Sequence, residues 1–486
     1  MDQIETPLTG SGSREEHLSV GATNRIAGYL AGLSFTDLPT ALVELTKQCV
    51  LDTLGVTIGA SSLAPEAKLV MEYVTDLGGK PESSILGFGG KAPAPWATFV
   101  NGSLGHMLDY DDIGGGGHPS ITTVLVGFAV AEKCGAVSGR DFITALAGGM
   151  DLQTRLAAAI DIPDWTIVEG WFATQLLGFL SGAATAGRLF NLDEAAMANA
   201  LGIGFNQMSG SRQMAVGAAT HMRSMQAGFS GQGAILAADL ARRGVVGSKD
   251  VLEGRYGLFR TYVRTDDPDW SALVDGLGTK FPLLDLHGFK VWPACGYTRP
   301  TNAATRQLRQ QYDLKPDDIE TIIVIGGSGG TKLLSEPIEL KRRPHLSIDG
   351  KYSIPFTTAV MMVNGNVTLR DYTDDGLRDP TVLAMADRVS YRARVPSDGP
   401  GFDSAGLPLP TIEIRTKDGR TLSHTPDGVP GDPRYPVDWP LLEAKFRDCA
   451  SFSLKPIPQA NIERTIALVH DLENLADVTE IVRLLV

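Results

Sequence analysis

Small side chains dominate residues 228–244, a stretch with the spacing of a helix. Glycine and alanine recur there every few positions, at Gly231, Gly233, Ala234, Ala237, Ala238 and Ala241. Small side chains let two helix backbones approach closely, as a tightly packed bundle requires. We therefore expect this stretch to form a buried helix among other helices.

The region from about residue 20 to residue 286 is a succession of such segments, rich in alanine, glycine and leucine. Residues 41–56 are a clear case, because Leu42 and Cys49 recur on one helical face and Glu44 lies on the other. These patterns predict a mainly α fold with a large all-α helical domain.

A further helix is expected to begin after Asn191 or Asp193, either of which can cap its first turn. It should run through Asn199. Gly202 and Gly204 stand where its end is expected, because glycine commonly follows the last turn of a helix.

The sequence changes character near Phe289, where prolines and aromatic residues cluster. Strand patterns follow at residues 321–325, 388–395 and 411–415, and residues 417–420 form a typical hairpin turn. We expect a smaller α+β domain here, at residues 289–434, which we call the lid.

Helical patterning returns in the last part of the chain, with stretches near residues 441–446 and 462–475. We expect this part to pack back on the first domain. The predicted organisation is therefore a helical domain at residues 1–288, the lid, and a C-terminal part of the helical domain at residues 435–486.

Charge and cysteine usage exclude several classes of function. The formal net charge of −13 is unsuited to nucleic-acid binding, which relies on a basic surface. The four cysteines are far apart and form no C-x-x-C pair, which fits a reducing compartment. Neither a secretory signal nor an apolar stretch of membrane-spanning length is recognisable, so we expect a cytoplasmic protein with no membrane partner.

Residues 106–118 hold the densest group of ionisable side chains. Three aspartates and two histidines flank four consecutive glycines: His106, Asp109, Asp111, Asp112, Gly114 to Gly117 and His118. A flexible glycine loop lets backbone amides and a histidine approach a ligand, and neighbouring carboxylates can raise one another's pKa toward the range of a general base. The group is a candidate catalytic site, and a solvated loop is the alternative.

A metal site is a second chemical interpretation of the same residues, since carboxylates and a histidine offer oxygen and nitrogen ligands. Their spacing matches neither the calcium-binding loop, which ends in a glutamate, nor a zinc pattern. We therefore expect no metal.

Two other segments carry candidate binding residues. His221 and Arg223 directly precede the small-residue helix, where an arginine could grip a carboxylate with two parallel hydrogen bonds, or simply lie at the surface. Lys290 and Cys295 lie at the border between the expected domains, a common place for ligand sites. A buried structural thiol fits Cys295 better than a nucleophile, because no Cys-His-Asn arrangement is recognisable.

The glycine-rich residues 326–330 follow a predicted strand but do not make a phosphate-binding loop. The G-x-G-x-x-G spacing is not met, and no lysine followed by serine or threonine is present at the required place. The helical region before it is also unlike the βαβ unit of a dinucleotide-binding domain.

The three groups of candidate residues, at 106–118, 221–223 and 290–295, follow one another in an order that resembles the MmgE/PrpD superfamily. This superfamily contains 2-methylcitrate dehydratases, cis-aconitate decarboxylases and iminodisuccinate epimerases. The resemblance spans nearly the whole chain. The residues that carry it are Phe99 to Gly102, His106, Asp109 to Asp112, His118 to Ser120, Gly170 and Trp171, Gln226 to Gly228, Lys290, Pro293 to Thr298, Ser353 to Pro355, and Lys445, Phe446 and Cys449.

The resemblance implies a homodimer in which each subunit has a large all-α domain and a smaller α+β lid, with the active site between them and no cofactor. It also implies a citrate-like or aconitate-like carboxylate as substrate. Asp109 resembles the active-site aspartate of the family, and His118 resembles its loop histidine. His221 is a further candidate for proton transfer.

Several pocket positions depart from the family pattern. Ile113 replaces a threonine, Phe172 a histidine, Arg223 a lysine, Arg299 a histidine and Phe356 a tyrosine. The two arginines keep positive charge but do not readily give up a proton, so they suit carboxylate binding, as Lys290 also does. The three apolar residues would make one wall of the pocket less polar and could accept an apolar substituent.

The leading hypothesis is therefore a cofactor-independent lyase, a dehydratase or decarboxylase, with Asp109 and His118 moving protons. Two alternatives remain open. One is an isomerase or epimerase, which needs the same proton removal without a leaving group. The other is an inactive relative that only binds a small acid, because so many family acid positions have changed.

Overall fold

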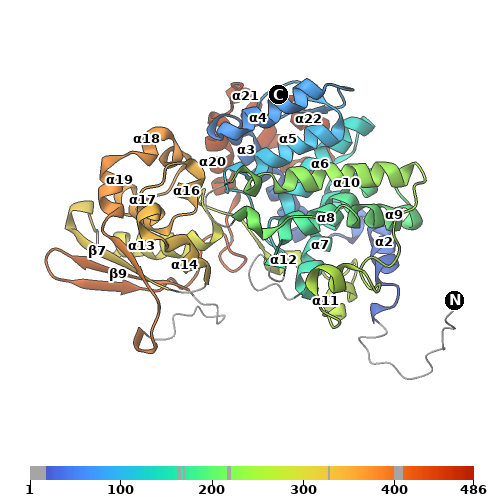
Figure 1. The fold of residues 1–486 in the computed structure, drawn as a ribbon. Coiled ribbons are helices and arrows are strands. Elements are labelled where there is room, and N and C mark those ends of the chain that lie inside the picture. The colour runs from blue at the N-terminus through green and yellow to red at the C-terminus, as the bar shows by residue number, and fades with distance from the viewer. Residues whose placement is uncertain (1–17, 161–165, 168–169, 216–219, 327–328, 399–408) are drawn as a thin grey trace.

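The structure is a computed structural model that describes residues 18–160, 166–167, 170–215, 220–326, 329–398 and 409–486. Most of the chain before residue 289 forms a bundle of helices (Figure 1). The main helices of this part are α2 (Ala22–Gly32), α3 (Thr40–Leu63), α4 (Pro65–Leu77), α5 (Ala94–Met107), α6 (Pro119–Cys134), α7 (Gly139–Ile160), α8 (Ala173–Leu189), α9 (Glu194–Phe205), α10 (Gln226–Arg242), α11 (Trp270–Val274) and α12 (Leu283–Leu286).

Three short pairs of strands lie between these helices. Each pair is antiparallel and two residues long on each side. Their strands are β1 (Ser83–Ser84) with β2 (Lys91–Ala92), β3 (Ile113–Gly114) with β6 (His287–Gly288), and β4 (Thr166–Ile167) with β5 (Trp171–Phe172). The β3–β6 pair brings residues that are far apart in the sequence to the border of the lid.

The small residues of α10 allow the close packing that the sequence predicts. α10 lies against α5 and α8. A Cβ added at Gly228 would lie 2.4 Å from Ser103 Oγ, and one added at Gly102 would lie 2.7 Å from the backbone of Ala227. Larger side chains at these positions would push the helices apart. The prediction of a buried small-residue helix is confirmed.

Helix α9 begins where expected but ends later. The Asp193 side chain caps it by accepting a hydrogen bond from the Ala196 amide at 2.8 Å. The helix continues to Phe205, past both glycines that were expected to end it. Gly202 is needed for packing instead, since an added Cβ would lie 2.2 Å from the backbone oxygen of Ser248. An end at Gly202 is therefore wrong, whereas Gly204 lies one residue before the observed end.

The lid is an α+β unit around a four-stranded sheet. The strand order is β10-β9-β7-β8, with β7 and β8 parallel and the other pairs antiparallel. The strands are β7 (Ile319–Ile325), β8 (Val389–Arg392), β9 (Thr411–Thr416) and β10 (Thr421–His424). The helices are α13 (Arg299–Gln311), α14 (Gly329–Ser335), α15 (Ile338–Arg342), α16 (Ser347–Lys351), α17 (Ile354–Asn364), α18 (Asp374–Leu377) and α19 (Pro380–Ala386).

The end of the chain returns to the helical bundle as α20 (Trp439–Ser451), α21 (Gln459–His470) and α22 (Thr479–Arg483). Leu442 and Phe446 of α20 belong to the hydrophobic core of the bundle, whereas a second core fills the lid. In Figure 1, α20 stands at the side of the bundle that faces the lid. The mainly α fold with a smaller α+β portion is confirmed.

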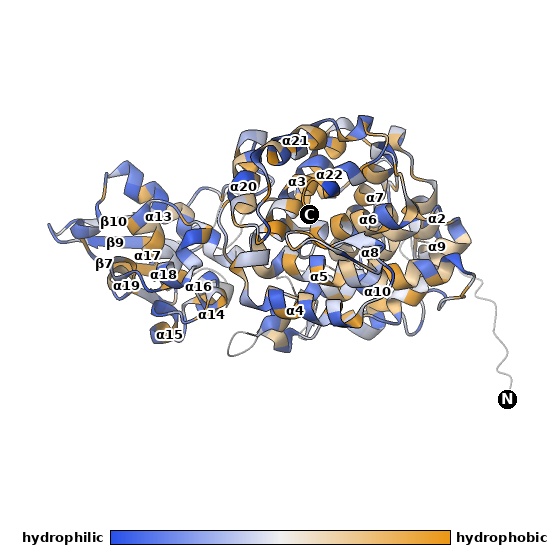
Figure 2. Ribbon diagram, turned by 90° about the horizontal axis from the view of Figure 1, so that it is seen from above, coloured by the Kyte–Doolittle hydropathy of each residue, from blue (hydrophilic) through white to orange (hydrophobic). Residues whose placement is uncertain are grey.

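Apolar side chains are concentrated in the bundle, and in Figure 2 the outer strands of the lid are largely hydrophilic. This distribution matches the hydrophobic cores of the described residues: the largest lies in the bundle, a second fills the lid, and a third lies around α4 and α5. Across the residues that the structure describes, every helix is too short or too polar to cross a lipid bilayer.

Candidate active site

The loop between α5 and α6 is buried and closely packed. Asp109 adopts a left-handed backbone conformation with φ of 48°, and the four glycines from Gly114 to Gly117 also have positive φ. A Cβ at Gly114 would lie 2.0 Å from the backbone oxygen of Leu286, and one at Gly117 would lie 2.3 Å from Thr174 Oγ1. The glycines therefore serve close backbone approach and positive φ angles.

Asp109 forms a buried ion pair with Lys290. The Lys290 ammonium donates to the Asp109 carboxylate and, at 3.0 Å, to the Asp109 backbone oxygen. Burial raises the pKa of Asp109, but the positive charge of Lys290 and further cationic neighbours lower it by more, so it lies well below its usual value. Asp109 is therefore ionised at neutral pH.

Asp111 links the two histidines of the loop. His106 Nδ1 lies 2.9 Å from Asp111 Oδ1, and His118 Nδ1 lies 2.9 Å from Asp111 Oδ2. His118 Nδ1 is also 2.6 Å from the backbone oxygen of Asp112. Burial raises the pKa of Asp111, but His106, His118 and Lys290 lower it to well below its usual value. Asp111 does raise the pKa of Asp109, as expected for neighbouring carboxylates, but other neighbours lower it by more. The expectation that either carboxyl reaches the range of a general base is therefore wrong.

Arg223 fixes the protonation of His106. One guanidinium nitrogen of Arg223 donates to His106 Nε2. Because an arginine can only donate, Nε2 accepts, and the proton of the neutral ring is on Nδ1, which donates to Asp111. Burial lowers the pKa of His106 to about 4, and Arg223 contributes to this shift. His106 therefore stays neutral and relays a hydrogen bond from Arg223 to Asp111.

The same three side chains come close enough to hold a metal ion, since ligand atoms of His106, Asp111 and His118 lie within 4.8 Å of one another. The hydrogen bonds argue for a different use. A metal would have to displace the Nδ1 proton of His106, and it would face Arg223 and Lys290, whose ammonium is 3.9 Å from Asp111. This arrangement favours a hydrogen-bond network.

Aromatic rings hold the Arg223 guanidinium. Its carbon lies 4.6 Å from the centre of the Phe172 ring and 5.5 Å from that of Tyr352. Such contacts orient a guanidinium and leave its edges for hydrogen bonds. Arg223 Nε, Asp109 Oδ2 and the Tyr352 hydroxyl are all buried without a hydrogen-bond partner among the described residues. Unpaired buried polar atoms are costly, so this group is suited to a polar ligand.

Tyr352 and Lys351 reach this site from the lid, and the sequence reasoning missed both. The Tyr352 phenol faces Asp109, and burial together with this carboxylate raises the pKa of the phenol well above the usual value. The Lys351 ammonium donates to the backbone oxygen of Met107 at 3.1 Å, and burial lowers its pKa to about 8. Their place directly before Ser353, in a segment that resembles the family, was the available signal.

Cys295 is a buried thiol next to this site. Burial, together with the negative charge of Asp109, raises its pKa to about 12. Its amide donates to the backbone oxygen of Lys351 at 3.1 Å, which ties the border segment to the lid. The structural interpretation of Cys295 therefore fits its environment better than a nucleophilic one.

The other predicted binding residues are distributed as follows. Ile113 is buried in the β3–β6 pair, opposite Gly288. Phe356 is fully buried in the lid core, where its ring lies 6.2 Å from that of Tyr372. His221 is exposed at the surface. Their roles in binding or catalysis stay predictions.

Arg299 is buried but has partners of its own. Its guanidinium donates to Asp432 Oδ1 at 2.6 Å and to the backbone oxygen of Pro430 at 2.9 Å. These contacts fasten the start of α13 to the chain that leaves the lid. Arg223 is thus the arginine that the structure brings to Asp109, and a substrate contact of Arg299 stays a prediction.

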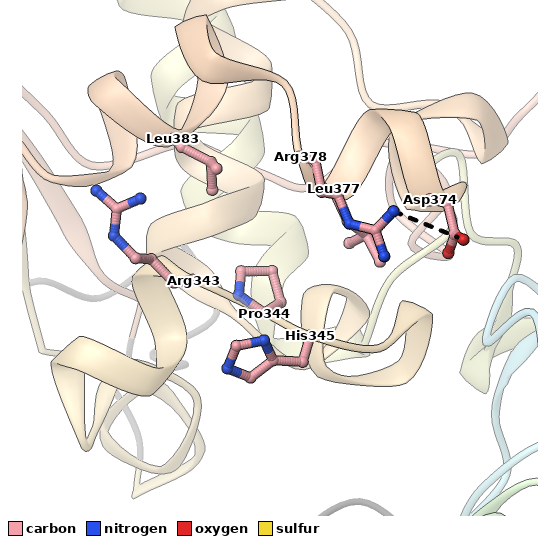
Figure 3. A pocket seen from close by; sticks show the side chains of 7 residues that line it. All are labelled: Arg343, Pro344, His345, Asp374, Leu377, Arg378 and Leu383. Atoms are coloured by element: carbon pink, nitrogen blue, oxygen red, sulfur yellow. Dashed lines mark ion pairs between the residues drawn. The ribbon is translucent and has the colours of Figure 1, made fainter.

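A separate pocket of about 230 Å³ lies in the lid (Figure 3). On one side of it, Arg378 pairs with Asp374 at 3.8 Å. Its lining includes none of the residues around Asp109: it consists of Arg343, Pro344, His345, Asp374, Leu377, Arg378 and Leu383. The candidate active site is therefore the cluster at the border of the two units.

Comparison with known protein families gives two matches along the chain. The MmgE/PrpD N-terminal domain matches residues 24–271, and the MmgE/PrpD C-terminal domain matches residues 292–471. The chain belongs to the MmgE/PrpD family. The resemblance on which the sequence reasoning relied is thus confirmed.

Characterised relatives match almost end to end. Cis-aconitate decarboxylase of Mus musculus is 26% identical over 480 residues, which cover 95% of this chain and 93% of that protein. Cis-aconitate decarboxylase of Aspergillus terreus (strain NIH 2624 / FGSC A1156) is 25% identical over 498 residues, or 97% of each chain. The human cis-aconitate decarboxylase is 25% identical over 479 residues, covering 95% of this chain and 94% of that protein.

Proposed function

We propose that the protein is a carboxy-lyase that removes carbon dioxide from an aconitate-like polycarboxylate. The main support is the buried group of unpaired polar atoms on Asp109, Arg223 and Tyr352, beside the Lys290 ammonium. Cationic groups in a buried site favour an anionic ligand. The names of the three relatives indicate the same substrate class and reaction.

Arg223 and Lys290 would bind the substrate carboxylates. Arg223 is held by Phe172 and Tyr352, so little side-chain entropy is lost when it binds. The Phe172 ring supplies apolar surface beside Arg223, and Ile113 would add to it. Such a surface would suit an unsaturated carbon chain or an alkyl substituent.

In the proposed reaction, the bond between a carbon atom and its carboxylate group breaks and carbon dioxide leaves. The bonding electron pair forms a new double bond to the neighbouring carbon. The electrons of the existing carbon–carbon double bond move to its far carbon atom, where negative charge builds up beside a conjugated carboxylate. Lys290 and Arg223 stabilise that charge. The carbanion equivalent then takes up one proton, so that the product has one carbon dioxide fewer.

His118 is the proposed proton donor. Its Nδ1 is committed to Asp111 and to the Asp112 backbone, so proton exchange would run through Nε2. Both partners of Nδ1 are hydrogen-bond acceptors, so Nδ1 acts as the donor and keeps its proton during the transfer. The neutral Tyr352 phenol is the second group that could donate a proton at this site.

The ion pair of Asp109 with Lys290 makes Asp109 a poor candidate for the base that dehydration or epimerisation would need. Both of these reactions need a base strong enough to remove a proton beside a carboxylate. The pKa of Asp109 is held well below its usual value, which makes it a weak base. Decarboxylation needs a proton donor and stabilisation of charge, and it makes no such demand on Asp109.

Purified protein incubated with cis-aconitate, 2-methylcitrate and alkyl-substituted aconitates tests the proposal. Released carbon dioxide is measured together with the mass of the product. We expect carbon dioxide release from an aconitate-type acid. His118→Asn should lower kcat by about 10²- to 10⁴-fold, the usual contribution of a general acid.

Other outcomes would contradict the carboxy-lyase. Loss of water alone would show a dehydratase. Deuterium uptake from the solvent without loss of water or carbon dioxide would show an isomerase or epimerase. Thermal stabilisation by these acids without turnover would show a binding protein. The homodimer is also a proposal from the family resemblance, and light scattering on the eluting protein measures it directly.

A further inference from the structure

Lys445 of α20 contacts the backbone of the candidate active site. Its side chain is buried, and its ammonium donates to the backbone oxygen of Tyr110 at 2.5 Å and to that of Lys290 at 3.0 Å. It also lies 3.9 Å from the centre of the Tyr110 ring. Asp52 of α3 provides the opposite charge, with Oδ1 at 2.6 Å from the ammonium.

The two carbonyl groups belong to the two segments that meet in the active-site ion pair. Tyr110 directly follows Asp109, and Lys290 is the partner of Asp109. One ammonium therefore bridges both segments at the places where their side chains pair. Without it, each carbonyl would lose a donor in a buried environment.

We propose that Lys445 is a positioning residue for the reaction, which holds the Asp109 loop and the Lys290 segment at the separation that the active-site ion pair needs. The inference rests on the proposed function of that ion pair. Lys445 contacts neither the Asp109 carboxylate nor the Lys290 ammonium, and it reaches the two segments through the backbone oxygens of Tyr110 and Lys290. It therefore acts through Asp109 and Lys290. Misplacement of reacting groups by about 1 Å can lower a rate by about 10²-fold.

Asp52 makes this arrangement sensitive to pH. Burial raises its pKa to about 6, with contributions from Asp111 and Asp112, against the effect of Lys445. When the pH falls through about 6, Asp52 takes up a proton and Lys445 loses its counter-charge. The ionisable groups that face Asp52 come from α3, the Asp109 loop and α20, and they are Cys49, Tyr110, Asp111, Asp112, Lys445 and Cys449.

The central test removes both members of the buried pair, Lys445→Met with Asp52→Leu. Replacing both charges avoids leaving one of them unpaired, so the double variant should fold with a Tm close to that of the wild type. We expect kcat to fall by about 10²-fold and KM to change much less, because Arg223 still binds the carboxylate. A double variant with the wild-type kcat would overturn the proposal.

A matched control exists in α7. Arg155 pairs with Asp151 at 2.7 Å and, like Lys445, donates to backbone oxygens, including the buried oxygen of Leu273 at 3.3 Å and the half-buried oxygen of Asp275 at 3.0 Å. Arg155→Met with Asp151→Leu should leave kcat near the wild-type value. An equal loss of kcat in the control would show a general packing effect and would overturn the specific role of Lys445.

Asp52→Asn is a second variant that keeps the shape of the side chain. In the wild type, we expect kcat to fall as the pH drops below about 6, because protonated Asp52 no longer balances the charge of Lys445. The variant mimics protonated Asp52, so this fall should disappear, and its kcat at neutral pH should match the low-pH value of the wild type. Retention of the acid limb near pH 6 would overturn the role of Asp52 in the arrangement.

A structure of the double variant separates this proposal from the proposed function. If the wild type turns over no polycarboxylate, the carboxy-lyase proposal fails, whereas the positioning role is still decided by geometry. Loss of the ion pair between Lys290 and Asp109 in crystals of the double variant supports that role. An unchanged ion pair overturns it.

Discussion

The Lys290 ammonium and the Asp109 carboxylate join the segment that enters the lid to the loop between α5 and α6, across 181 residues of sequence. Both side chains are buried. Substitution of one partner would leave the other charge unpaired in a medium of low polarity, which is far more costly than the loss of an exposed ion pair.

Lys290→Met should therefore lower the free energy of unfolding by about 3–5 kcal/mol. The double variant Lys290→Met with Asp109→Asn should recover most of this loss, because neither charge remains. Urea unfolding of the wild type, both single variants and the double variant measures the coupling. Additive effects of the two single substitutions would contradict a direct ion pair.

Arg223→Met should raise KM for a polycarboxylate by about 10- to 100-fold, the value of one charge-assisted hydrogen bond pair. Arg223→Lys should lose less, because it keeps the charge but not the two parallel hydrogen bonds. Steady-state kinetics of both variants gives the comparison. A KM unchanged in Arg223→Met would remove Arg223 from the binding site.

Cys295 should resist alkylation at neutral pH, because its pKa of about 12 leaves almost no thiolate. Cys134 is exposed and serves as the internal control for labelling by iodoacetamide. Mass spectrometry of peptides after a timed reaction distinguishes the two. Rapid labelling of Cys295 in the folded protein would point to a reactive thiol, contrary to the structural interpretation.

Lys351 should make the stability depend on alkaline pH. Burial lowers its pKa from 10.5 to about 8, so between these values the unfolded state binds more protons than the folded state. The contribution of Lys351 to stability must then rise as the pH rises from about 8 to 10.5. Lys351→Met lacks this titration, so its stability relative to the wild type should decrease over the same interval in urea unfolding. A constant difference would contradict the lowered pKa.

Local patterns made the elements of the fold predictable. The spacing of Leu42 and Cys49 predicted α3, and the small residues after Gly228 predicted the packing of α10, because both depend on neighbours within a few turns. The hairpin between β9 and β10 was predictable from its turn, in which Gly419 has a φ of 90°. The end of α9 was not, because a distant backbone at Ser248 determines the need for Gly202.

The candidate site was predictable as a set of residues but not as a set of interactions. Asp109, His118, Arg223 and Lys290 were all named from the sequence. The direction of the Asp109 pKa shift was not, because it depends on Lys290. Arg299 could not be told apart from Arg223 without knowing that Asp432 is its partner.

The lid enters and leaves the bundle at neighbouring points, since the Phe289 amide donates to the Gly431 backbone oxygen at 2.8 Å. The two chain crossings are thus only one hydrogen bond apart. For protein engineering, this pair of residues is the place to exchange one lid for another: a lid from another family member could be grafted there, provided that it carries a lysine at the place of Lys290 to pair with Asp109.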